Sequence, residues 1–205
     1  MTSGGDTDGY RTIAMGTRSA LWQGGLVLAA VLTAWPGAAA EEAPTCVPAP
    51  DAPPDVAECN YSPPYLLRMT PAVRERPNRS PETLVAAALL EFTPEPVWSE
   101  RFGDAVRRER ARNTTEEDVE EARDFHEDMI RAGDIYLFRR ADVDGMVLIR
   151  WSVFEHGTRE RIMTWDWALR RIDGEWRILG GAKPPPLQAI NRRWLDADIG
   201  MPDTY

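Results

Sequence analysis

Four β-rich runs decide the fold of this sequence: DIYLFRRADV (residues 134–143), MVLIRWSVFE (146–155), RIMTWDWALRRI (161–172) and EWRILG (175–180). Asp-Gly pairs at 144–145 and 173–174 and the pair His156-Gly157 separate them. Asp-Gly between such runs is the strongest short-range signal for a hairpin. Because consecutive hairpins make an antiparallel meander, we predict a curved four-stranded antiparallel sheet.

The third run predicts which face of this sheet is buried. Alternate residues of a strand point to the same side, so Met163, Trp165, Trp167 and Leu169 share a face that is largely apolar. The opposite face is mixed in character. A sheet with one apolar face is expected to pack that face on helices.

Three helical stretches precede the sheet. Ser80-Pro81-Glu82 is a typical helix start, with a capping serine and a proline in the first helical position. A second helix is predicted over 97–112. A third follows the cap at Thr114-Thr115, carries acids in its first turn and ends before Gly133. Helices followed by a sheet define an α+β domain, which we place at residues 80–182.

The closing run from Trp167 to Ile178 resembles the final hairpin of the nuclear-transport-factor-2-like superfamily, which includes ketosteroid isomerase and the polyketide cyclases. It combines an apolar strand, an Asp-Gly turn and a Trp-x-Ile strand. The resemblance covers about residues 80–182 and implies a cone-shaped fold whose pocket serves catalysis in some members and binding or assembly in others. A simpler cystatin-like fold, with helices packed on a sheet, is the alternative.

The first forty residues have the pattern of a secretory signal peptide. Two arginines precede an uncharged stretch over 19–40, and Ala38-Ala39-Ala40 supplies the small residues that favour cleavage before Glu41. The alternative is an uncleaved signal anchor, since a run of about 20 residues can span a bilayer. Met15 is an alternative start. We therefore predict export to the periplasm or the medium.

Residues 41–79 form a proline-rich arm that contains both cysteines of the chain. Proline removes backbone donors, so the arm is predicted to lack a regular helix or a central strand. In an oxidising compartment Cys46 and Cys59 are expected to form a disulfide. A short amphipathic tail follows the domain, over 183–205.

The charge balance excludes one class of function. The 205 residues carry a net charge of −9, which disfavours nucleic-acid binding because phosphates attract basic surfaces. The sequence contains no glycine-rich phosphate loop, no nucleophile elbow and no metal-ligand spacing. We predict neither a cofactor nor a metal site.

His126 is the first candidate for a catalytic group. It shares an inward-facing helical stripe with Val119, Ala122 and Met129. A histidine that faces a pocket can act as a general base, since its ordinary pKa lies near neutrality. The alternative is a hydrogen-bonded histidine at the edge of the core.

Asp166 is a second candidate, because an acid between two tryptophans could have a raised pKa. Strand alternation, however, directs it away from Trp165 and Trp167. We expect a solvated carboxylate paired with Arg150 or Arg170.

Trp151, Trp165 and Trp167 are candidate ligand-binding residues and form, with Trp176, a dense aromatic set. Such a set can line an apolar ligand cavity or fill the core between sheet and helices.

These observations favour an exported, non-enzymatic module that binds a small apolar ligand or a protein partner, a second copy of the chain among them. One alternative is a small isomerase- or cyclase-type enzyme with His126 as base. In a second alternative, residues 19–40 stay on the protein as a membrane anchor, and the domain is part of an envelope or secretion complex.

Overall fold

The computed structural model describes residues 44–196 and contains one antiparallel sheet whose strand order in space follows the chain. Its strands are β1 (Cys46–Pro48), β2 (Ala57–Leu66), β3 (Gly133–Val143), β4 (Met146–Glu155), β5 (Arg161–Ile172) and β6 (Glu175–Ile178). The predicted α+β class is confirmed. The last four strands agree with the predicted runs to within two residues.

The sheet has six strands, so the prediction of four is wrong. The proline-rich arm supplies the other two, and β2 pairs with β1 on one side and with β3 on the other. Its prolines are tolerated because Pro63 and Pro64 lie where the pairing with β3 shifts register, between Asn60 and Tyr65. A proline at such an irregularity removes no ladder hydrogen bond.

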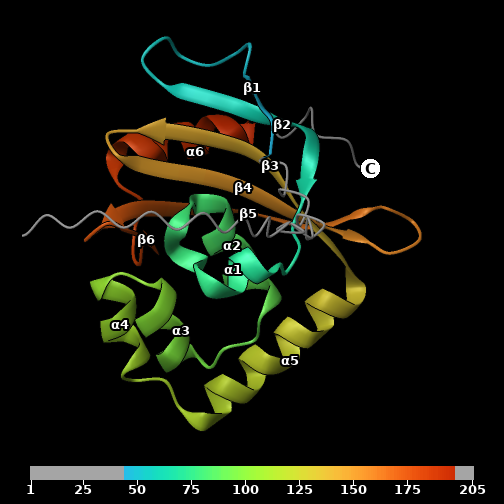
Figure 1. Ribbon diagram of the computed structural model, residues 1–205, viewed down its shortest axis with the longest axis vertical. Helices are drawn as coiled ribbons and strands as arrows, with labels where there is room; N and C mark the ends of the chain where they lie inside the picture. The colour runs from blue at the N-terminus through green and yellow to red at the C-terminus, as the bar shows by residue number, and fades with distance from the viewer. Residues whose placement is uncertain (1–43, 197–205) are drawn as a thin grey trace, which may run out of the picture. The chain divides into compact units, whose positions relative to one another are not determined.

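Helices connect and cover these strands (Figure 1). They are α1 (Pro71–Glu75), the 3-10 helix η1 (Pro77–Arg79), α2 (Pro81–Leu90), α3 (Glu95–Phe102), α4 (Ala105–Ala111), α5 (Glu116–Ala132) and α6 (Pro185–Asp196). Ser80 caps α2 by accepting from the Thr83 amide, and Thr115 caps α5 in the same way. Gly133 follows α5 directly, as predicted.

The single helix expected over 97–112 is two helices, because the chain touches β6 between them. Gly103 forms a bridge with Ile178, and the Asp104 amide donates to the carbonyl oxygen of Ile178 at 3.0 Å. The Asp104 carboxylate then caps α4 by accepting from the Arg107 amide at 3.0 Å. This contact with the sheet outweighs the helical periodicity of the sequence.

Both faces of the sheet are covered. In Figure 1, α2 lies in front of the sheet and α6 lies behind it. Nine consecutive residues of β4, from Met146 to Phe154, are buried. Odd-numbered residues such as Ile149 and Trp151 pack in the core beneath α2, whereas Met146 and Leu148 pack against α6. A strand buried on both sides reads as a continuous apolar run rather than as an alternating one.

The expectation that Asp166 lies on a solvated face is wrong, because α6 covers that face. Asp166 accepts two hydrogen bonds of 2.8 Å from Arg150, and the side chains of Arg150 and Asp166 are only 1% and 5% exposed. Arg150 also donates to the carbonyl oxygen of Trp194 on α6, at 3.0 Å. The pair therefore ties the helix to the sheet.

The predicted disulfide between Cys46 and Cys59 is confirmed and joins β1 to β2. It indicates a non-reducing environment, as found outside the cytoplasm. Among residues 44–196, no helix has the length and apolar character needed to cross a membrane. The predicted signal segment, its cleavage point at Ala40/Glu41 and the alternative start at Met15 lie outside the described residues.

Candidate functional site

A cavity of about 310 Å³ lies between α5, the end of α2, the start of α3 and strands β4 and β5. We call it the aromatic pocket, because six aromatic side chains line it: Phe92, Trp98, Phe125, Trp151, Trp165 and Trp167. Its polar lining consists of Glu91, Thr93, Glu95 and His126. Aromatic walls with a few polar groups are typical of small-molecule sites.

Strand register brings the sheet's tryptophans together. Trp151 on β4 lies directly opposite Trp165 on β5, with ring centroids 5.0 Å apart. Trp167, two residues further along β5, points to the same side and meets Trp151 edge to face at 5.4 Å. Trp98 on α3 extends the contact to the helices, 6.3 Å from Trp167.

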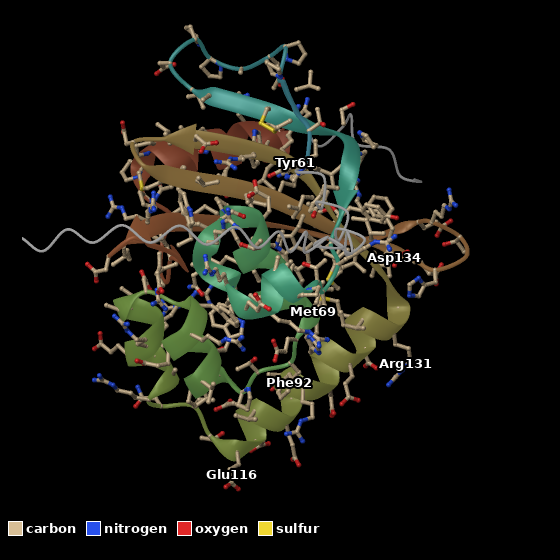
Figure 2. All side chains as sticks on the ribbon, in the orientation of Figure 1. Tyr61, Met69, Phe92, Glu116, Arg131 and Asp134 are labelled. Carbon is tan, nitrogen blue, oxygen red and sulfur yellow. A yellow bond between two sulfur atoms is a disulfide. The ribbon has the colours of Figure 1, made fainter. Side chains whose placement is uncertain are left out.

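Helix α5 and the segment after α2 supply the opposite wall. Phe92, labelled in Figure 2, lies on the segment that follows α2, and its ring is 5.7 Å from that of His126 on α5. The ring of Phe125 meets that of Trp165 edge to face at 6.0 Å between centroids, and the two residues are 49% and 42% exposed. The pocket therefore reaches solvent between Phe125 and Trp165.

His126 lines the pocket, and its hydrogen bond fixes its orientation. Its Nε2 lies 3.0 Å from the carbonyl oxygen of Leu89. A carbonyl oxygen can only accept, so the Nε2–H of His126 is the donor of this hydrogen bond. Within residues 44–196, no titratable side chain hydrogen-bonds to His126. Ala122 and Met129 of the predicted stripe line the pocket with it, whereas Val119 does not.

Two carboxylates in the pocket were missed by the sequence analysis. Glu95 accepts a hydrogen bond of 2.6 Å from the Ser99 hydroxyl, and Glu91 lies 3.5 Å from Arg101. The only sequence signal for them is their position on the proline-interrupted segment around Phe92.

Two guanidinium groups lie over rings of the pocket but do not line it. Arg107 is 4.7 Å from the centroid of Trp98, and Arg123 is 5.3 Å from that of Phe92. Burial lowers the pKa of Arg107, and the nearby Glu95 carboxylate opposes that shift. These cation–π contacts hold the two rings in position.

Among residues 44–196, the indole nitrogen of Trp151 is the one buried side-chain nitrogen or oxygen that lacks a hydrogen-bond partner. Trp151 is 1% exposed, and within residues 44–196 its Nε1 makes no hydrogen bond. A buried donor without an acceptor costs about 1–3 kcal/mol.

The structure separates Asp166 from this site, because it lies on the opposite face of β5 beneath α6. Trp176 packs against the core but does not line the pocket. The tryptophans therefore fill both roles predicted for them, because Trp151 is fully buried in the core and also lines the aromatic pocket. No group of three or more candidate metal ligands occurs in the described part of the chain.

No protein-family model, no curated protein and no solved structure matches this chain. The resemblance to the nuclear-transport-factor-2-like superfamily therefore stays a prediction from the sequence.

Proposed function

We propose that this chain is an exported, non-enzymatic module that binds a small apolar molecule in the aromatic pocket. The observation that carries the proposal is the pocket itself, a cavity of about 310 Å³ with six aromatic residues in its wall and exposed rings where it meets solvent. Solvent-connected clefts with mostly apolar and aromatic walls and a few polar groups are the usual form of small-molecule sites.

The hydrogen-bond and ion-pair partners of the titratable side chains in the pocket favour binding over catalysis. General acid–base chemistry at His126 would need a second group to orient it or to share its proton. Its one hydrogen-bond partner is instead the backbone carbonyl of Leu89. Glu95 is engaged by Ser99, and Glu91 faces Arg101. This arrangement orients side chains around a ligand without offering a proton relay.

The proposal of export rests on the segment before the domain and on the disulfide of the arm. N-terminal sequencing of the secreted or periplasmic protein tests it. A chain that begins at Glu41 supports a cleaved signal. A full-length chain in the membrane fraction would favour the anchored alternative.

The pocket is tested with N-phenylnaphthylamine, an uncharged dye whose fluorescence rises in apolar surroundings. Ala122 lines the pocket from α5 but is exposed, so Ala122→Phe fills the space without disturbing the core. Its matched control is Glu121→Phe, which adds the same ring to the same helix outside the pocket.

We expect saturable dye binding to the wild type and to Glu121→Phe, and at least tenfold weaker binding to Ala122→Phe. Equal binding by all three proteins would place the dye elsewhere and refute the proposal. No binding by the wild type would refute it as well.

A further inference from the structure

We propose that the ligand of the aromatic pocket is an amphiphilic cation, whose apolar body lies among the rings and whose ammonium group lies at the mouth. The mouth consists of the exposed residues that line the pocket, which are Glu91, Ala122, Phe125 and Trp165. This inference rests on the proposed binding function. It adds the charge of the ligand and the end of the ligand that faces solvent.

The interior of the pocket suits an apolar body. Trp98 and Trp151 are buried there, and Trp167 is half-buried. A dry cavity of about 150 Å³ holds one benzene ring. The aromatic pocket, at about 310 Å³, offers roughly twice that space. A charge among the buried rings would lose its hydration, so a charged group of the ligand is expected to stay at the mouth.

The two rings at the mouth can contact a cation, because a positive charge is attracted to the face of an aromatic ring. Arginines already lie over the rings of Trp98 and Phe92, at 4.7 Å and 5.3 Å from the centroids. Within residues 44–196, no guanidinium lies over Phe125 or Trp165. The protein thus makes this contact itself at two rings and leaves it open at the two rings that meet solvent.

Two carboxylates flank the mouth. Glu91 has a side chain that is 46% exposed, and Arg101 contacts only its Oε2, at 3.5 Å. Glu121 is exposed on α5 one turn before Phe125, so the two residues lie on the same side of the helix. In the described part of the chain Glu121 forms no ion pair. An ammonium group at the mouth would therefore lie close to carboxylates as well as to ring faces.

The basic residues near the pocket do not reverse this charge. No arginine or lysine lines it, and Arg101 and Arg107 each interact with a lining carboxylate. Helix α5, one wall of the pocket, carries eight acidic residues against two arginines. Arg161 precedes Trp165 by four residues on β5, about 13 Å along the strand, where solvent screens its charge. An anionic ligand would be repelled here, whereas a cationic one would be attracted.

The test uses three probes that share a benzyl body and a similar shape. Benzyltrimethylammonium is a cation, dimethyl benzyl carbinol is neutral and phenylmethanesulfonate is an anion. Each is titrated against N-phenylnaphthylamine bound to the full chain, at neutral pH and low ionic strength, and displacement of the dye gives its affinity. We expect the cation to bind about fivefold more tightly than the neutral probe and at least tenfold more tightly than the anion. Added salt should reduce both preferences.

Glu91→Gln and Glu121→Gln test the carboxylates. Their matched control is Glu120→Gln, which removes the same charge from an exposed position that helical geometry turns away from Phe125 by about 100° relative to Glu121. The measured quantity is the ratio of the affinities for the cation and the neutral probe, in which changes of shape cancel. We expect this ratio to fall about three- to fivefold in Glu91→Gln and about twofold in Glu121→Gln, and to stay unchanged in Glu120→Gln.

Phe125→Leu tests the ring. Phe125 is exposed, so the variant is expected to fold, and leucine keeps an apolar side chain at the mouth without an aromatic face. The ratio of the affinities for the cation and the neutral probe should fall about threefold.

The outcomes separate this inference from the proposed function. If the dye does not bind, or if Ala122→Phe binds it as the wild type does, the pocket is not a binding site and both fail. If the dye binds in the pocket but the cation displaces it no better than the neutral probe or the anion, the inferred charge is wrong although the binding function stands. The same conclusion follows if Glu91→Gln and Glu120→Gln give equal ratios.

Discussion

Asp166→Ala should be one of the most destabilising single substitutions outside the aromatic pocket. It removes the carboxylate that faces Arg150 through two hydrogen bonds of 2.8 Å, beneath α6. The Arg150 side chain is 1% exposed, so water cannot replace the lost partner. Removing one member of a buried ion pair costs about 3–5 kcal/mol.

The chain offers a matched control in Asp128→Ala. Asp128 and Arg131 on α5 also form an arginine–aspartate pair, with a distance of 2.9 Å. Their side chains are 75% and 71% exposed, and Arg131 is labelled on the outer side of α5 in Figure 2. An exposed pair contributes about 0–1 kcal/mol. The two variants therefore differ mainly in burial, and the buried pair also has two hydrogen bonds where the exposed pair has one.

Urea unfolding followed by far-UV circular dichroism measures both variants. With a slope of about 2 kcal/mol per molar urea, Asp166→Ala should lower the midpoint by about 1.5–2.5 M. Asp128→Ala should lower it by less than about 0.5 M. Equal shifts would refute the argument, because burial could not then be the cause.

A double variant separates the buried charge from lost packing. Arg150→Met with Asp166→Leu removes both charges and keeps apolar volume beneath α6. Replacement of a buried pair by apolar side chains is often neutral or stabilising. We expect the double variant to recover more than half of the stability that Asp166→Ala loses. A double variant as unstable as the single one would mean that packing dominates.

Three further variants test other parts of the fold. Burial and the adjacent Glu82 raise the pKa of Tyr61 in the folded protein. An unfolded tyrosine ionises above about pH 10, so the wild type should lose stability as the pH rises past that value. Tyr61→Phe should not show this loss. Gly133→Ala would place a Cβ 2.0 Å from a carbonyl oxygen of β4 and should cost about 3 kcal/mol or more. Replacing Cys46 and Cys59 by serine opens a loop with a sequence separation of 13 and should cost about 3 kcal/mol.

Denaturant unfolding at several pH values checks all three. If Tyr61→Phe still loses stability at alkaline pH, a group other than Tyr61 causes that loss. A stable Gly133→Ala would mean that β4 moves away from the end of α5 at little cost. A double serine variant as stable as the wild type would show that the strand pairing of β1 and β2 holds the arm without the disulfide.

The sequence predicted the elements whose signals are local. Ser80 and Thr115 mark helix starts because a capping side chain acts within three residues. Gly133 does follow α5, but its backbone is extended, so the close approach of Phe154 on β4 explains the glycine rather than a left-handed cap. The Asp-Gly turns, at 144–145 and 173–174, adopt the positive φ angles that tight hairpins need. Such patterns can be interpreted without knowing what packs against them.

The sequence predictions failed where contacts between segments far apart in the chain determine the structure. The strand over 57–66 contains two prolines, and only its pairing with β3 shows where they are tolerated. Asp166 is buried because α6, which lies twenty residues later in the chain, folds back over the sheet. The aromatic pocket depends on how α5 and β5 fit together, so alternation could bring Trp165 and Trp167 to one face but could not show whether the space beside them is filled.

The burial of β4 on both faces has a consequence for the chain before it folds. The segment MVLIRWSVF, residues 146–154, is apolar and rich in β-forming residues, which is the composition of segments that stack into aggregates. Arg150 interrupts it near its middle with a charge, and such a charge resists in-register stacking. The double variant that restores stability to the native fold should therefore aggregate more readily during refolding. Arg150 thus contributes twice, to the docking of α6 in the folded chain and to the solubility of the unfolded one.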